Sequence, residues 1–198
     1  MNRPTLKLNS ILPWLMCFAA FVGLSKSALA TVNENLAYTY YQVNVDSASS
    51  LRKALNAASP FKSNGRIFHG HTDWHISWHF WWDERPDGRC SIKRVSVEFT
   101  STIGLPQLIS ATIAQQNQFN TYVAALRTHE LGHVNVGKSA AYAIDQAIFN
   151  LPEMASCSSL GAAANDVGNR MLSDYQAREI RYDAETEHGK TQGAWLDR

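Results

Sequence analysis

The sequence predicts an α+β fold, in which a small antiparallel sheet from the first half of the chain packs on long helices from the second half. Large apolar residues alternate with polar ones over 71–82, which is typical of a strand with one buried face. Apolar residues recur every three or four positions over 108–149 and again over 160–182, which is typical of amphipathic helices. We therefore expect one domain over residues 31–198.

The composition is that of an ordinary globular protein. Hydrophobic residues make up 45% of the 198 residues and charged residues 18%, which argues against a disordered or fibrous chain. The formal net charge is +1, so the overall charge indicates neither a nucleic acid partner nor an acidic substrate. We expect no nucleic acid among the partners of this protein.

Residues 1–30 have the organisation of a secretory signal peptide. Basic residues Arg3 and Lys7 precede an apolar run over 11–24, and an A-x-A pattern over 28–30 provides a cleavage site. The apolar run is shorter than the roughly 20 residues that a transmembrane helix needs, so we expect no stable membrane insertion after cleavage. The sequence therefore predicts a periplasmic or secreted protein.

Three cysteines are present, and signal cleavage would remove Cys17. In an oxidising compartment the remaining Cys90 and Cys157 most simply pair with each other. The alternative is that both bind zinc, although no C-x-x-C spacing supports it. We predict the Cys90–Cys157 disulfide.

The first half of the chain carries the strand patterns. A β-branched and aromatic run over 36–45 indicates a strand, and a short helix is expected over 47–58. Strands over 71–82 and 90–100 flank a turn at 85–88 that contains proline and glycine, so these strands should form an antiparallel hairpin.

Histidines recur on the polar face of the strand over 71–82. His71, His75 and His79 are each four residues apart, so on a strand neighbours lie ~13 Å apart at ~3.3 Å per residue. One ion cannot be shared across that distance. These histidines therefore indicate a polar sheet face, with the lining of a substrate groove as the alternative.

A long helix is expected from about residue 107, because Pro106 ends the strand pattern and neither proline nor glycine follows before residue 132. This helix carries an H-E-x-x-H motif at 129–133, in which two histidines share one face and can bind one ion. Glu130 lies ~100° around the helix, where its carboxylate can reach a water on that ion. Two nitrogen ligands and a nearby base are the features of a zinc hydrolase. Gly132 lowers helix propensity by roughly 1 kcal/mol, which predicts close approach of another backbone or of substrate.

A catalytic zinc ordinarily takes three protein ligands and a water, so a third ligand is required. The extended motif with a third histidine is excluded, because Val136 and Ser139 stand where that motif has glycine and histidine. His188 is the only later histidine, and the carboxylates Asp183 and Glu185 compete with it. A carboxylate that does not bind the ion could instead orient a ligand histidine.

These motifs resemble the bacterial domain of unknown function 922 family, which is regarded as a family of secreted zinc-dependent proteases. The resemblance rests on T-H-E-L-G-H at 128–133, on a strand with Thr72, Trp74 and Trp78, on Cys90, and on Y-D-x-x-T-x-H-G-x-x-Q-G at 182–193. It covers nearly all of the mature chain. It implies a zincin-like fold and peptidase chemistry, and it favours His188 as the third ligand. It names no substrate.

The expected function is therefore zinc-dependent hydrolysis of a peptide or protein substrate. His129, His133 and His188 would hold Zn²⁺, while Glu130 would act as the general base on a zinc-bound water. Tyr182 or Tyr142 would donate a hydrogen bond to the oxyanion. The alternatives are an envelope or binding protein that holds zinc without catalysis, and a zinc amidase that acts on cell-wall peptides.

Overall fold

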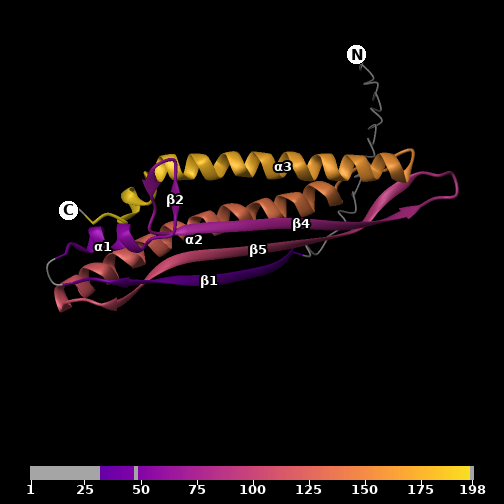
Figure 1. Ribbon diagram of the computed structural model, residues 1–198. Coiled ribbons are helices and arrows are strands. Elements are labelled where there is room, and N and C mark those ends of the chain that lie inside the picture. Colours follow the sequence, from indigo (N-terminus) through magenta and orange to yellow (C-terminus); the bar gives the residue numbers. More distant parts are fainter. Residues whose placement is uncertain (1–31, 47–48, 197–198) are drawn as a thin grey trace, which may run out of the picture.

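A computed structural model describes residues 32–46 and 49–196 of this chain (Figure 1). The segment expected to be a signal peptide, with Cys17, lies outside these ranges. Within them, no helix combines the length and the apolar character that a membrane crossing requires. The described residues form a mixed α+β structure, in which a sheet carries two long helices on one face.

The main sheet contains β1 (Val32–Asn44), β4 (His71–Glu84) and β5 (Cys90–Ser110), in the order β1-β5-β4. The hairpin of β4 and β5 is antiparallel, as predicted. However, β1 pairs with β5 in parallel, so the prediction of a purely antiparallel sheet is wrong. The reason lies in the connection. The chain turns back after β1, so β4 runs opposite to β1. Because β5 reverses again and lies between them, it runs parallel to β1.

Strand β5 is longer than the sequence pattern predicts. It continues through Pro106 to Ser110, so the assignment of Leu108 and Ile109 to the following helix is wrong. Pairing of β5 with β4 ends at Gly104, and beyond this residue only β1 continues alongside β5. A proline without a backbone N–H is tolerated where a strand has one neighbour, which explains why Pro106 does not end β5.

Two long helices cover one face of the sheet (Figure 1). Helix α2 (Ile113–Phe149) packs against β4 and β5, and α3 (Cys157–Thr186) packs along α2. The first turn of α2 is fixed by a capping box. Thr112 Oγ1 accepts a hydrogen bond from the backbone N–H of Gln115, and the Gln115 side chain accepts one from the N–H of Thr112. This box places the start of the helix several residues later than its apolar pattern predicts.

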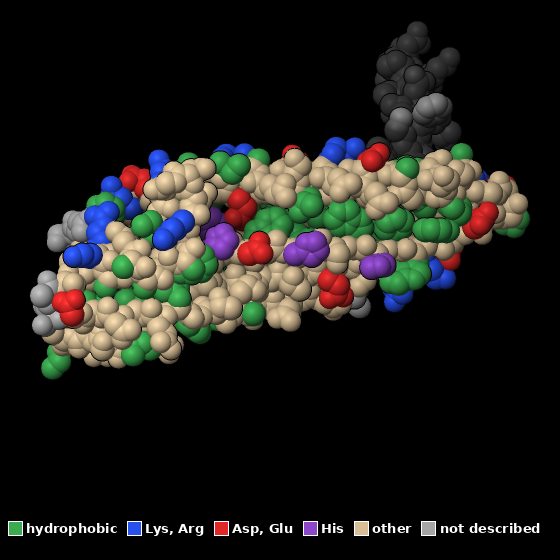
Figure 2. Space-filling view, viewed as in Figure 1, with side chains coloured by type: hydrophobic (Ala, Val, Ile, Leu, Met, Phe, Trp, Pro, Cys, Tyr) green, Lys and Arg blue, Asp and Glu red, His purple; other side chains and the backbone are tan. Residues whose placement is uncertain are grey.

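The alternating pattern of β4 separates a covered face from an open one, as predicted. Trp74 and Trp78 point toward the helices, where Gly137 of α2 and Gly168 of α3 leave room for them. A Cβ at either glycine would lie 2.8 Å from the facing indole ring. The histidines at 71, 75 and 79 are exposed, and histidine and acidic side chains form a row along this part of the surface (Figure 2).

The predicted disulfide between Cys90 and Cys157 is confirmed. It joins the start of β5 to the start of α3, with a Cα–Cα distance of 5.0 Å. The backbone of Cys90 also exchanges two hydrogen bonds of 2.9 Å with Met154, which fixes the loop between the two helices against the sheet. This end of the molecule is opposite the end where α3 terminates (Figure 1).

Reduction of this disulfide is expected to lower the free energy of unfolding by about 4 kcal/mol, from the loop entropy of the 67-residue separation. Chemical denaturation with and without reductant measures this difference. Cys157→Ser should unfold at the midpoint of the reduced protein in both conditions. Equal stability of oxidised and reduced wild type would contradict the prediction.

Candidate metal centre

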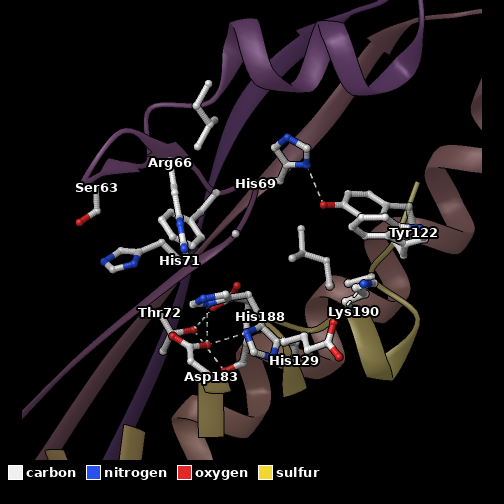
Figure 3. Close-up of a pocket in the computed structure, with 18 of the residues that line it drawn as sticks. Ser63, Arg66, His69, His71, Thr72, Tyr122, His129, Asp183, His188 and Lys190 are labelled. Carbon is white, nitrogen blue, oxygen red and sulfur yellow. Dashed lines mark hydrogen bonds and ion pairs between the residues drawn. The ribbon is translucent and has the colours of Figure 1, made fainter. Parts of the chain in front are cut away.

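The two histidines of the H-E-x-x-H motif lie on one face of α2 and meet Asp183 from the last turns of α3 (Figure 3). The Nε2 atoms of His129 and His133 are 3.3 Å apart. Asp183 Oδ1 lies 3.2 Å from the first nitrogen and 3.1 Å from the second. We call these three atoms the ligand triangle. The three residues form a group that can hold a metal ion.

The dimensions of the ligand triangle fit a small tetrahedral cation. Zinc bonds to nitrogen and oxygen are about 2.0–2.2 Å long, so two ligands of a tetrahedral zinc lie about 3.3 Å apart. The triangle edges of 3.1 to 3.3 Å agree with this distance. Three protein ligands also leave the fourth position of a tetrahedron for a water or a substrate atom.

The second nitrogen of each imidazole is held by another side chain. His129 Nδ1 lies 3.0 Å from Gln192 Oε1, and His133 Nδ1 is hydrogen-bonded to Glu179 Oε2. In both pairs the oxygen accepts, so each Nδ1 carries a proton, and a metal ion at the triangle would take the place of any proton on the two Nε2 atoms. The tautomer with its proton on Nδ1 is the one that binds a metal through Nε2, and such hydrogen bonds orient ligand histidines in metalloproteins.

The charges around the triangle favour a cation. Burial opposes protonation of His133, but the carboxylates of Asp183 and Glu179 outweigh burial and raise the pKa of this histidine to about 10. Burial raises the pKa of Asp183, yet hydrogen bonds with His129 and His133 lower it well below its ordinary value. The raised pKa of His133 and the lowered pKa of Asp183 both indicate that a positive charge is stabilised at the ligand triangle. A divalent cation would place its positive charge at the same position.

Glu130 lies beside the triangle without belonging to it. Its side chain is buried, and Thr72 of β4 donates a 2.7 Å hydrogen bond to Oε2. Gly70 leaves the space that this carboxylate occupies, because a Cβ there would lie 2.3 Å from Oε1. Burial raises the pKa of Glu130 above its ordinary value, against the hydrogen bond from Thr72. A buried carboxylate of raised pKa is suited to accept a proton.

A pocket of about 770 Å³ opens onto the triangle. Its lining includes Glu130 and Glu179, and side chains from α1 (Leu51–Ala58), from the segment 63–72 and from the chain after α3. Pockets of about 300–1,000 Å³ commonly hold ligands of small-molecule size. The arrangement therefore provides a binding space next to the candidate metal ligands.

The structure places the three third-ligand candidates differently. Asp183 belongs to the ligand triangle. His188 lies at its rim, with Nδ1 3.4 Å from Asp183 Oδ1, its ring against Phe68, and 42% of its side chain exposed. Glu185 is exposed and does not line the pocket. The geometry thus favours Asp183 as the third ligand, with His188 as its neighbour.

The two tyrosines considered as oxyanion donors do not line the pocket. The Tyr182 ring stacks on His129 at 5.2 Å, and its hydroxyl donates a 3.1 Å hydrogen bond to the backbone oxygen of His129. It therefore positions this histidine. Tyr142 follows His133 by nine residues on α2, about 13 Å farther along the helix, and its hydroxyl donates to Glu34 at 2.9 Å. The structure does not bring Tyr142 to the site.

Sequence reasoning missed Glu179 and Gln192 as orienting residues, although weak signals exist for both. Glu179 precedes Asp183 by four residues on α3, so the two carboxylates share a helix face. Gln192 is the glutamine of the C-terminal signature that supports the family resemblance. Its side-chain amide also donates a 3.0 Å hydrogen bond to the Tyr182 hydroxyl, which fixes the orientation of the amide.

Gly132 is approached closely, but by the side chain of Tyr182, whereas the sequence predicted another backbone or a substrate. A Cβ at Gly132 would lie 1.9 Å from the Tyr182 hydroxyl oxygen. Gly132→Ala should therefore displace this ring from His129. We expect a net loss of about 1–3 kcal/mol in the free energy of unfolding, as for overpacked core sites, despite the better helix propensity of alanine.

Denaturation of the Gly132→Ala variant measures this loss, and Gly161→Ala is the matched control. Gly161 also lies within a helix, and nothing lies within 4 Å of a Cβ built there. Its replacement should raise the free energy of unfolding by up to about 1 kcal/mol. A stabilising effect of both substitutions would contradict the tight packing of Tyr182.

A family model described as "Bacterial protein of unknown function (DUF922)" matches residues 38–189. The matched range contains the whole ligand triangle and Glu130. A search of curated proteins found none that matches the chain. A search of solved structures also found no match.

Proposed function

We propose that this chain, which belongs to the DUF922 family of bacterial proteins, is a zinc-dependent metallopeptidase with zincin-like chemistry that cleaves peptide bonds outside the cytoplasm. One observation carries this proposal: the ligand triangle has the size of a zinc site and lies beside the buried carboxylate of Glu130. A site that only holds zinc for structure usually closes with four protein ligands and needs no adjacent base. The pocket next to the triangle supports a site that admits substrate.

The residues of the chain would act as follows. His129, His133 and Asp183 would hold the zinc, with Gln192 and Glu179 orienting the two imidazoles. Bound zinc would lower the pKa of a water and polarise the substrate carbonyl.

Glu130 would perform the proton transfers. Its carboxylate would take a proton from the attacking water and deliver it to the leaving amine nitrogen as the C–N bond breaks. Thr72 would keep this carboxylate in place through the hydrogen bond to Oε2.

Location outside the cytoplasm is the second part of the proposal. Disulfides persist in oxidising compartments and are rare in the bacterial cytoplasm. The Cys90–Cys157 disulfide and the signal-like sequence of residues 1–30 both support export. Periplasmic and secreted locations are equally compatible with these features.

Metal analysis combined with a cleavage assay tests the function. The purified protein should contain about one zinc per chain, and it should cleave members of a peptide library that includes cell-wall peptides. Chelation should abolish cleavage, and added zinc should restore it. Zinc without any cleavage would favour a binding protein, and cleavage of cell-wall peptides alone would favour an amidase. Absence of zinc binding would overturn the proposal.

A further inference from the structure

A small hairpin stands at the mouth of the pocket. Its strands are β2 (Lys62–Ser63) and β3 (Arg66–Ile67), and it lies beside the end of α3 (Figure 1). The turn residues Asn64 and Gly65 have φ values of 48° and 74°, as two-residue hairpins favour. The backbone of the hairpin is closed by the pairs Lys62–Ile67 and Ser63–Arg66, so its shape does not depend on side-chain charges.

Arg66 of this hairpin lines the pocket, and its side chain extends toward the part that contains His188 and Asp183 (Figure 3). Two other cations line the same pocket. Lys190 forms a 3.0 Å ion pair with Glu187, and Arg52 lies over the Trp195 ring. The side chain of Arg66, in contrast, makes no hydrogen bond or ion pair with any residue in the described ranges. Its guanidinium is therefore available to an external anion.

Carboxylates of the metal centre line the same pocket as Arg66, but their contacts are with other residues. Glu130 accepts a hydrogen bond from Thr72, Glu179 accepts one from His133, and Asp183 faces both histidines. Arg66 pairs with none of them within the described part of the chain. The guanidinium thus forms no direct ion pair with these acids and no side-chain contact that closes the hairpin within the described part of the chain.

We propose that Arg66 determines substrate specificity, and that preferred substrates carry a carboxylate near the amide bond that is cleaved. This inference rests on the proposed hydrolase function. A guanidinium binds a carboxylate through two parallel hydrogen bonds, and Arg66 is exposed, so solvent screens part of this contact. The carboxylate could belong to an acidic side chain or to a free C-terminus, and both present the same chemistry to Arg66.

Matched peptides test this preference. Each set differs only in Glu, Gln or Lys at positions around the cleaved bond, with the C-terminus either free or amidated. The wild type should show kcat/KM about twofold to fivefold higher for peptides that carry a carboxylate, the range expected for an ion pair of an exposed arginine. Preference for internal Glu over Gln would identify the acidic side chain, and preference for the free over the amidated end would identify the C-terminus.

Substitutions in the hairpin test whether the preference for carboxylate peptides depends on Arg66. Arg66→Ala should remove the preference, and Arg66→Glu should reverse it in favour of Lys peptides. Lys62→Ala is the matched control, because it removes an equal charge from the same hairpin at a position that does not line the pocket. It should leave the preference unchanged. Zinc content and denaturation midpoints should be equal in all variants.

A binding measurement separates this inference from the proposed function. Zinc-loaded Glu130→Gln protein, with and without Arg66→Ala, is titrated with the matched peptides after these have been given a fluorescent label. If the wild type cleaves peptides but Arg66→Ala keeps the preference, the inference is overturned and the hydrolase function stands. If the wild type cleaves nothing, Arg66-dependent binding of carboxylate peptides would still support the inference. Absence of such binding would overturn it.

Discussion

Glu130→Gln is expected to lower kcat by about 10²–10⁴-fold, the usual contribution of a general acid–base residue. Glutamine has the size of glutamate, so it fits the space above Gly70, and its amide oxygen can accept the hydrogen bond from Thr72. What the variant lacks is a group that takes a proton from water. Zinc content and the denaturation midpoint should therefore match the wild type, while peptide cleavage is lost.

Steady-state kinetics on a cleaved library peptide measure this effect, with zinc content determined on the same samples. Thr72→Val provides a graded comparison, because it removes the hydroxyl that holds the carboxylate but leaves the carboxylate itself. Its kcat should fall between those of wild type and Glu130→Gln. Retention of full activity in Glu130→Gln would remove Glu130 from the mechanism and leave the pocket without an assigned base.

The parts of the fold that the sequence predicted depend on local patterns. The period of two in β4 and the apolar period of α2 and α3 follow from residues that are neighbours in the chain. The parallel pairing of β1 and the length of β5 depend instead on how the chain returns after β1. Pro106 is an ordinary strand breaker in isolation, and only the missing neighbour beyond Gly104 explains why β5 continues.

In the candidate site, too, some residues could be predicted from local sequence and others depend on the tertiary structure. The positions of His129, Glu130 and His133 follow from the geometry of one helix, and α2 places them as the motif requires. The third ligand comes from α3, and its identity depends on where that helix ends. The helix ends at Thr186, and His188 beyond it has a positive φ of 53°.

The turn after Thr186 therefore explains the choice between the candidates. Asp183 is still helical and projects from the α3 face that contacts α2, where Glu179 also lies. The left-handed backbone at residues 187 and 188 carries the His188 ring to the rim of the pocket. Gly189 indicates in the sequence that the helix ends near this point, but it does not indicate where the turn places the His188 ring. Arg66 likewise has no sequence signal, because only the folded hairpin brings its guanidinium to the pocket.

Asp183→Ala is expected to weaken zinc binding more than any other substitution in the C-terminal segment. It removes one of the three atoms of the ligand triangle, and we expect a loss of more than about 100-fold in affinity, beyond the 10–100-fold typical of orienting residues. His188→Ala should change affinity by less than about tenfold, because its Nδ1 lies 3.4 Å from Asp183 Oδ1 and outside the triangle.

Competition with a chromophoric chelator measures the zinc dissociation constants of the wild type and of each variant. Glu185→Ala is the matched control, since it removes a carboxylate two residues after Asp183 on an exposed part of α3 and should leave zinc affinity unchanged. A larger loss in His188→Ala than in Asp183→Ala would transfer the ligand role to His188. It would also require the segment after Thr186 to bring that imidazole inward when zinc binds, because the present backbone directs it to the pocket rim.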